Sequence, residues 1–130
     1  MLFSTARKPI LIIDDSETIR QQVRDILVEA GYDVLEACDG QAGMETIDAK
    51  PSLAMVICDV NMPRMDGLQF LEKYRASNRV SPLPVVMLTT ARCPEEISKA
   101  KRLGARGWIV KPFHPDRLVA TVNWIAGNRS

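Results

Sequence analysis

Carboxylates that directly follow apolar segments are the residues whose chemistry is clearest. Asp14 and Asp15 follow the run Ile10–Ile13, and Asp59 follows the run 54–58. If these runs are parallel strands, the acids meet in the crevice at the carboxyl ends of the strands, where ligands bind in open α/β sheets. Carboxylates packed together repel each other and raise one another's pKa. Such a group of hard oxygen ligands suits a divalent cation, most naturally Mg²⁺.

Two later apolar runs also end in polar residues. Thr89 follows Val85–Leu88, and Lys111 follows Trp108–Val110. A carboxylate held beside a cation can act as a nucleophile toward a phosphoryl group. The lysine would then neutralise charge on the phosphoryl oxygens, and the threonine hydroxyl would bind one of them. Together these residue types predict formation of an acyl phosphate on an aspartate.

Each of these residues also has a simpler structural interpretation. Asp14 and Asp15 precede Ser16 and could cap the following helix, where acids are favourable. Lys111 could be an ordinary surface lysine. Asp59 is harder to explain in this way, because burying an unpaired charge at the end of an apolar strand is costly. The recurrence of polar residues at strand ends favours the chemical interpretation.

The elements that would position these residues follow from five short apolar runs, which are 10–13, 34–35, 54–58, 85–88 and 108–110. Between them, apolar residues recur at helical spacing. Gly31 and Gly104 are expected to end two of these helices, and Asp66 to cap another. A strand–helix unit repeated about five times predicts a parallel sheet covered by helices.

Composition indicates one globular domain. The chain has 130 residues, 46% of them hydrophobic, with 17 Lys and Arg against 16 Asp and Glu. These values exclude a disordered chain and a collagen-like fibre. A net charge of +1 and an aromatic content of 5% also argue against a nucleic-acid-binding domain.

The cysteines and the apolar runs indicate the compartment. Cys38, Cys58 and Cys93 are odd in number and form no C-x-x-C pair, which fits a reducing environment. We expect Cys38 and Cys58 to be small buried hydrophobic residues. No apolar run is long enough for a signal sequence or a membrane span. The sequence therefore predicts a cytoplasmic protein without a membrane partner.

The segment Asp59–Gly67, with the sequence DVNMPRMDG, resembles the phosphoacceptor loop of response-regulator receiver domains. The motifs Ile13-Asp14-Asp15, Thr89 and Lys111-Pro112-Phe113 match the other signatures of that family in order and spacing. The chain is most similar to the stand-alone chemotaxis type. This resemblance implies a flavodoxin-like, doubly wound (βα)5 sandwich with a parallel sheet of strand order 2-1-3-4-5. It also implies that residues 1–130 form a single receiver domain with no output domain.

By the same resemblance, Asp59 would accept a phosphoryl group from a histidine kinase. Asp15 and Asp59 would bind Mg²⁺ directly, Asp14 mostly through water, and Asn61 through its main-chain carbonyl. Lys111 would pair with the phosphoryl oxygens. The domain would catalyse only its own phosphorylation and dephosphorylation, so it is not an enzyme in the usual sense.

The resemblance also implies a switch. Thr89 would move to bind the phosphoryl group, and Trp108 would change rotamer in step with it. Tyrosine or phenylalanine usually occupies that position, so Trp108 departs from the family pattern. The Lys111–Pro112 peptide is expected to be cis. Asn61 and Ala91 match positions that influence how readily water attacks the acyl phosphate.

The output surface implied by the family lies on the fourth helix, fifth strand and fifth helix. Here it carries Lys99, Lys101, Arg102, Arg106, Trp108 and Arg117. We expect this basic face to bind an acidic or amphipathic protein segment, although it could also be an ordinary solvated surface. A flagellar motor switch protein is the first candidate partner, and the receiver is expected to be a monomer.

Several alternatives remain open from the sequence. A phosphorelay intermediate would pass the phosphoryl group to a histidine phosphotransferase. A Mg²⁺-dependent aspartyl phosphatase would need an acid where Asn61 stands. A flavin-binding electron carrier would need hydroxyls and glycines in place of Asp14-Asp15-Ser16. A pseudo-receiver would keep the fold without the chemistry.

Overall fold

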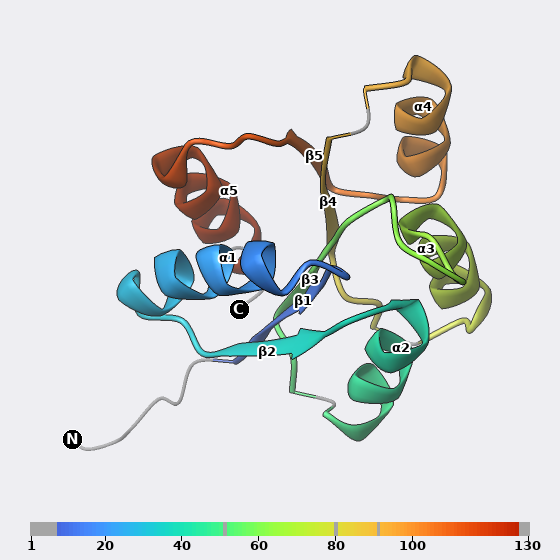
Figure 1. The fold of residues 1–130 in the computed structure, drawn as a ribbon. Helices are drawn as coiled ribbons and strands as arrows, with labels where there is room; N and C mark the ends of the chain where they lie inside the picture. The colour runs from blue at the N-terminus through green and yellow to red at the C-terminus, as the bar shows by residue number, and fades with distance from the viewer. Residues whose placement is uncertain (1–7, 51, 80, 91, 128–130) are drawn as a thin grey trace.

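The computed structural model describes residues 8–50, 52–79, 81–90 and 92–127. Strands and helices alternate along the chain (Figure 1). The strands are β1 (Ile10–Ile13), β2 (Val34–Ala37), β3 (Met55–Cys58), β4 (Val85–Thr89) and β5 (Gly107–Val110). The helices are α1 (Glu17–Glu29), α2 (Gly40–Ala49), α3 (Gly67–Ala76), α4 (Pro94–Arg102) and α5 (Pro115–Gly127).

The strands form one parallel sheet in the order β2-β1-β3-β4-β5. The predicted fold class and strand order are therefore confirmed. Strand β1 lies inside the sheet, with β2 on one side and β3, β4 and β5 following on the other. The strand order therefore reverses between β1 and β3. Ligands bind at this kind of position in open α/β sheets.

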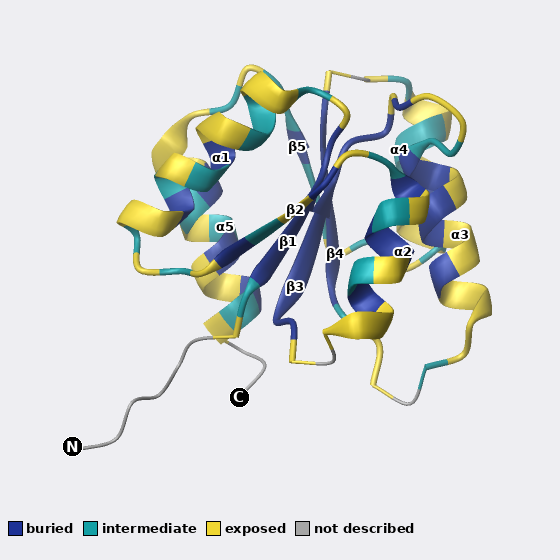
Figure 2. Cartoon of the chain, turned by 60° about the horizontal axis from the view of Figure 1, so that its bottom comes forward, coloured by how far each residue is buried: buried dark blue, intermediate teal, exposed yellow. Residues whose placement is uncertain are grey.

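The helices form two layers, with α1 and α5 on one face of the sheet and α2, α3 and α4 on the other (Figure 2). Each layer closes over its own apolar core. In β1, Leu11 and Ile13 belong to the core beneath α2, α3 and α4, and Ile10 and Ile12 to the core beneath α1 and α5. Covering on both faces explains why the strands read as continuous apolar runs instead of alternating ones.

Local sequence signals fix most helix ends. Asp66 caps α3 in a capping box with Gln69, as predicted for this aspartate. Gly31 and Gly104 follow α1 and α4 with φ angles of 98° and 90°, a conformation that favours glycine. Helix α4 is different, because Cys93 precedes it without any side-chain capping hydrogen bond.

Two sequence expectations need correction, and one is confirmed. Cys58 is buried as predicted, but the prediction that Cys38 is buried is wrong, because Cys38 is exposed. It follows the last residue of β2, an edge strand, so it lies beyond the packed part of the sheet. Strand β2 also runs through Glu36 to Ala37, two residues further than the apolar run Val34-Leu35.

None of the helices among the described residues could cross a membrane.

Candidate functional site

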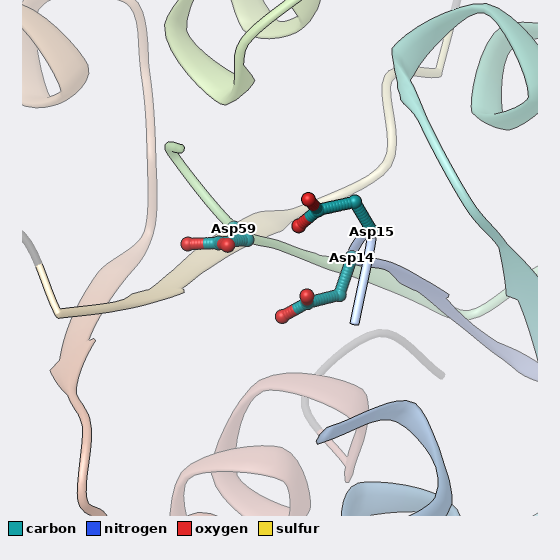
Figure 3. A group of neighbouring side chains, drawn as sticks. All are labelled: Asp14, Asp15 and Asp59. Atoms are coloured by element: carbon teal, nitrogen blue, oxygen red, sulfur yellow. The ribbon is translucent and has the colours of Figure 1, made fainter. Parts of the chain in front are cut away.

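The register of the sheet brings the predicted acids together. Ile13 of β1 pairs with Cys58 of β3, so Asp14 and Asp59 leave neighbouring strands side by side. One carboxylate oxygen from each of Asp14, Asp15 and Asp59 lies within 4.8 Å of the others (Figure 3). Asp14 and Asp59 are only 2% and 6% exposed, whereas Asp15 is open to solvent.

Lys111 supplies the positive charge opposite these acids. Its Nζ lies 2.8 Å from Asp14 Oδ2 and 3.5 Å from Asp59 Oδ2, and its side chain is 11% exposed. The Lys111 amide donates a hydrogen bond to the Thr89 carbonyl at 2.9 Å, which fixes the start of the loop after β5. The next peptide bond, Lys111–Pro112, is cis. One ammonium group thus contacts two nearly buried carboxylates.

The pKa of Asp59 is raised above its usual value. Burial is the main cause, and the neighbouring Asp14 charge adds to it. Lys111, a hydrogen bond from Thr89 and the amide of Asn61 oppose this rise by favouring the ionised form. The geometry is that of a carboxylate held out of water among groups that stabilise negative charge.

Gly67 allows the loop after β3 to fold tightly over Asp59. Its amide donates to the Val60 carbonyl at 2.8 Å, and a Cβ atom there would lie 2.0 Å from the main-chain oxygen of Asp59. Only glycine fits such an approach between backbones. Arg64 in the same loop has a φ of 67° and pairs with Asp39 at 3.0 Å, which attaches the loop to the start of α2.

The turn from β1 into α1 is held by its own hydrogen bonds. The cap of α1 is Ser16, whose hydroxyl accepts the Ile19 amide at 3.2 Å. Asp14 instead accepts the Ser16 amide at 2.9 Å while also pairing with Lys111. Sequence reasoning missed Arg20, whose Nη1 donates to the Asp14 carbonyl at 2.6 Å. A basic residue one turn into the helix after an acidic pair was the available signal.

The two residues expected to switch lie on neighbouring strands. Thr89 is fully buried at the end of β4, and Trp108 on β5 packs half-buried against the core beneath α4. Within the described part of the chain, the buried Nε1 of Trp108 has no hydrogen-bond partner. Ala91, expected to influence hydrolysis, lies outside the described residues.

The basic residues assigned to the output surface lie on α4, on α5 and in the turn before β5. Four of them are exposed and Lys99 is half-buried, the exposed ones being Lys101, Arg102, Arg106 and Arg117. The structure therefore gathers Asp14, Asp15, Asp59, Thr89 and Lys111 at one edge of the sheet. The three carboxylates are hard oxygen donors that fit Mg²⁺.

The family profile of the response regulator receiver domain matches residues 10–123. The chain belongs to the response-regulator receiver family. The matched range includes both the acidic cluster and the loop from Asp59 to Gly67. Membership of this family favours the receiver interpretation over the electron-carrier and phosphatase alternatives.

This receiver is similar to chemotaxis proteins from several bacteria. It is 39% identical to chemotaxis protein CheY1 of Helicobacter pylori strain J99 over 119 residues, 91% of this chain and 96% of the relative. It is 34% identical to a CheY homologue of Campylobacter jejuni over 122 residues, 93% of this chain and 94% of that one.

Solved structures show the same similarity. Chemotaxis protein CheY4 of Vibrio cholerae superposes with a TM-score of 0.84 at 38% identity, covering 92% of this receiver and 99% of that chain. A CheY-like receiver from Methanospirillum hungatei gives a TM-score of 0.86 at 27% identity, covering 94% and 95% of the two chains. The receiver is thus CheY-like in both sequence and fold.

Proposed function

We propose that this protein is a phosphorylation-activated switch of a two-component system in the cytoplasm. A histidine kinase donates a phosphoryl group to Asp59, and the phosphorylated receiver signals by binding another protein. The observation that carries this proposal is the contact of Lys111 with both Asp14 and Asp59, inside a cluster of three carboxylates. The cluster and its lysine also lie at the carboxyl ends of the strands, where ligands bind in open α/β sheets.

Mg²⁺ would be held by Asp15, Asp59 and the main-chain carbonyl of Asn61, with Asp14 acting through water. When bound, this ion neutralises charge on the phosphoryl oxygens and lowers the repulsion between the carboxylates. Lys111 neutralises part of the same charge from the other side.

The proposed transfer uses few covalent changes. An oxygen of the Asp59 carboxylate attacks phosphorus, the P–N bond of the donor phosphohistidine breaks, and the imidazole leaves with the bonding electron pair and is protonated. The Lys111 ammonium lies 3.5 Å from Asp59 Oδ2, so it is close enough to form an ion pair with the new phosphoryl oxygens. The Thr89 hydroxyl, which already bonds Asp59, would bind one of them.

A cavity of about 520 Å³ beside Lys111 supports a docking position for the phosphodonor. It is lined by Ile19, Gln22 and Ile26 on α1, by Pro112 and Phe113 in the loop after β5, and by Pro115, the first residue of α5. An apolar groove next to the reacting carboxylate suits the amphipathic helix that carries the phosphohistidine. A donor bound there would approach Asp59 from the side of Lys111.

The output would come from the basic face of α4, β5 and α5. The relatives named as chemotaxis proteins support a flagellar motor switch protein as the partner. The acyl phosphate would favour one of two packed states of Thr89 and Trp108, so that binding to the partner depends on phosphorylation. In a phosphorelay, a histidine phosphotransferase would take the phosphoryl group instead.

The chemistry is tested by incubating the protein with acetyl phosphate and Mg²⁺ and measuring its intact mass. We expect an increase equal to one phosphoryl group, which disappears in Asp59→Asn and when EDTA removes the cation. Asp25→Asn, an exposed change on α1, should leave the adduct unchanged. A wild-type protein that forms no adduct would instead be a pseudo-receiver.

The output surface is tested by the double variant Lys101→Glu/Arg102→Glu. We expect weaker binding of the phosphorylated protein to a purified flagellar switch protein, because the charge reversal opposes an acidic segment. The matched control is Lys50→Glu/Lys73→Glu, which reverses the same charge at exposed positions just after α2 and on α3. Equal affinity of both double variants would refute the assignment of this surface.

A further inference from the structure

Arg20 on α1 connects the acidic site to the edge strand β2. Its Nη1 donates to the main-chain oxygen of Asp14 at 2.6 Å, and its Nε donates to Glu36 on β2 at 3.0 Å. The side chain is 15% exposed, so this contact is largely shielded from water. We propose that Arg20 is a positioning residue for the cation site, which sets the direction of the Asp14–Asp15 turn; this rests on the Mg²⁺ binding proposed above.

The hydrogen bonds of Asp14 show why this contact matters. Its amide donates to the Ala37 carbonyl at 3.1 Å, and its carboxylate bonds the Ser16 amide and Lys111. The carbonyl is its remaining polar group, and Arg20 holds it. With both ends of the Asp14 main chain held, the residue has little freedom to rotate.

The same contact acts on Asp15 through the backbone. The carbonyl of Asp14 and the amide of Asp15 belong to one planar peptide unit, so fixing the oxygen fixes the plane from which Asp15 continues. Asp15 is exposed and lies outside the packed sheet, so its position depends on that plane. Losing the Arg20 contact would let the peptide rotate and would spread the carboxylates of Asp14 and Asp15 over more arrangements.

Electrostatics predicts the opposite effect from positioning. Removing a guanidinium takes a positive charge away from a cation site, and this alone would strengthen Mg²⁺ binding. A loss of affinity on removing Arg20 therefore cannot come from the charge. The direction of the change distinguishes the two explanations.

Arg24 provides a matched control within the same ion-pair network. It lies one turn further along α1 and binds the other oxygen of Glu36 at 3.0 Å. Its remaining contact is with the Val34 carbonyl at 3.5 Å, away from Asp14. Arg24→Ala thus removes the same side chain and a pairing with the same carboxylate, but leaves the Asp14 carbonyl bound.

The test is a titration of the intact protein with MgCl₂, followed by the chemical shifts of its backbone amides in NMR spectra. We expect Arg20→Ala to weaken Mg²⁺ binding about tenfold, as is typical when a residue that orients metal ligands is lost. Arg24→Ala should stay within about twofold of wild type, because it loses no contact with a ligand. Thermal unfolding of both variants shows whether they lose similar stability.

Arg20→Lys is the second variant, in case Arg20→Ala folds poorly. It keeps the charge, but one ammonium cannot reproduce the fork that spans Glu36 and the Asp14 carbonyl, so an intermediate affinity is expected. Equal or tighter Mg²⁺ binding by Arg20→Ala and Arg20→Lys, relative to Arg24→Ala, would overturn the role of Arg20. If wild type itself does not bind Mg²⁺, the proposed cation site fails as well.

Discussion

The acidic site at the carboxyl ends of β1 and β3 and the region of α4 and β5 are built in opposite ways. At the site, Asp14 is bonded through its amide, its carbonyl and its carboxylate, and Gly67 brings two backbones into contact. Helix α4 begins without a side-chain cap and contributes only Ala100 to the buried set. Beside it, Trp108 keeps a buried Nε1 that lacks a partner within the described residues.

This difference matches two different requirements. A phosphoryl acceptor needs carboxylates held in one geometry before the donor arrives, because reorganisation during transfer would raise the barrier. A switch needs two packed states of similar free energy, which is easier where a region has few buried contacts and unsatisfied groups. In this receiver, the rigid part would perform the chemistry and the weakly packed part would report it.

The largest expected effect comes from adding one methyl group to the rigid region. In Gly67→Ala, the new Cβ would lie 2.0 Å from the Asp59 carbonyl oxygen, and neither backbone can move without displacing the site. We expect a loss of about 3 kcal/mol or more in the free energy of unfolding. Urea denaturation would measure it. Gly127→Ala, where nothing lies within 4 Å of the added atom, should change stability little.

The glycine also shows where sequence reasoning reaches its limit. The strand-end positions of Asp14, Asp59 and Thr89 were predicted from apolar runs alone. The spacing of apolar residues and the polar residues that end each run are local signals. The strand order and the roles of the loop residues came from resemblance to a family. The contact between Gly67 and the Asp59 backbone depends on how the loop folds back, which no local pattern encodes.

The same limit applies to Arg20 and Cys38. Arg20 reaches Asp14 and Glu36 only because β2 lies beside β1, a long-range pairing. Cys38 was assigned to the core because cysteine is usually buried, but the end of an edge strand offers nothing to bury it. Residue preference predicts the average environment of a residue type, and the strand order decides the individual case.

A second prediction concerns the free-energy cost of burying the Asp59 carboxylate. Its pKa is raised in the folded state, mainly by burial, so the folded protein binds this proton more tightly than the unfolded chain. Below the ordinary pKa of 3.8, both states are protonated and Asp59 costs no stability. As pH rises through 3.8 toward the higher folded-state pKa, stability is lost, and the loss remains at neutral pH.

Asp59→Asn should therefore stabilise the protein at pH 7 by on the order of 1 kcal/mol, as is common when a functional charge is removed. The gain should shrink as the pH is lowered toward 3.8 and below. Thermal unfolding between pH 3 and pH 8 measures both effects. The control is Asp33→Asn at an exposed position just before β2. A variant that is destabilised at neutral pH would show that Asp59 holds the fold together.

A third and smaller effect is expected at Trp108. Trp108→Phe removes apolar contact with the core beneath α4, but it also removes a buried N–H whose lack of a partner costs about 1–3 kcal/mol. These changes oppose each other, so we expect a net change below about 1 kcal/mol in urea denaturation. A loss above about 2 kcal/mol would mean that the N–H is satisfied. Trp124→Phe, at a side chain 66% exposed, serves as the control.

The smallest predicted change tests whether the weak start of α4 matters for switching. Cys93 already has the extended backbone of a capping residue, with φ −68° and ψ 121°. Its thiol contacts Glu95 and makes no capping hydrogen bond. Cys93→Ser would supply a hydroxyl that can accept an amide of the first turn, for a gain of about 0.5 kcal/mol. Ser16→Ala, at the capped start of α1, should lose about 1 kcal/mol.

Hydrogen exchange of the α4 amides would then show whether this small gain stays local. If α4 rearranges when Asp59 is phosphorylated, a capped α4 favours the arrangement without the phosphoryl group, and phosphorylation must overcome that added preference. Cys93→Ser should therefore slow exchange in α4 and reduce the change in exchange that phosphorylation produces there. Slower exchange with an unchanged response to phosphorylation would mean that α4 moves as a rigid unit. The switch would then depend on Thr89 and Trp108 alone, and the weak start of α4 would have no part in it.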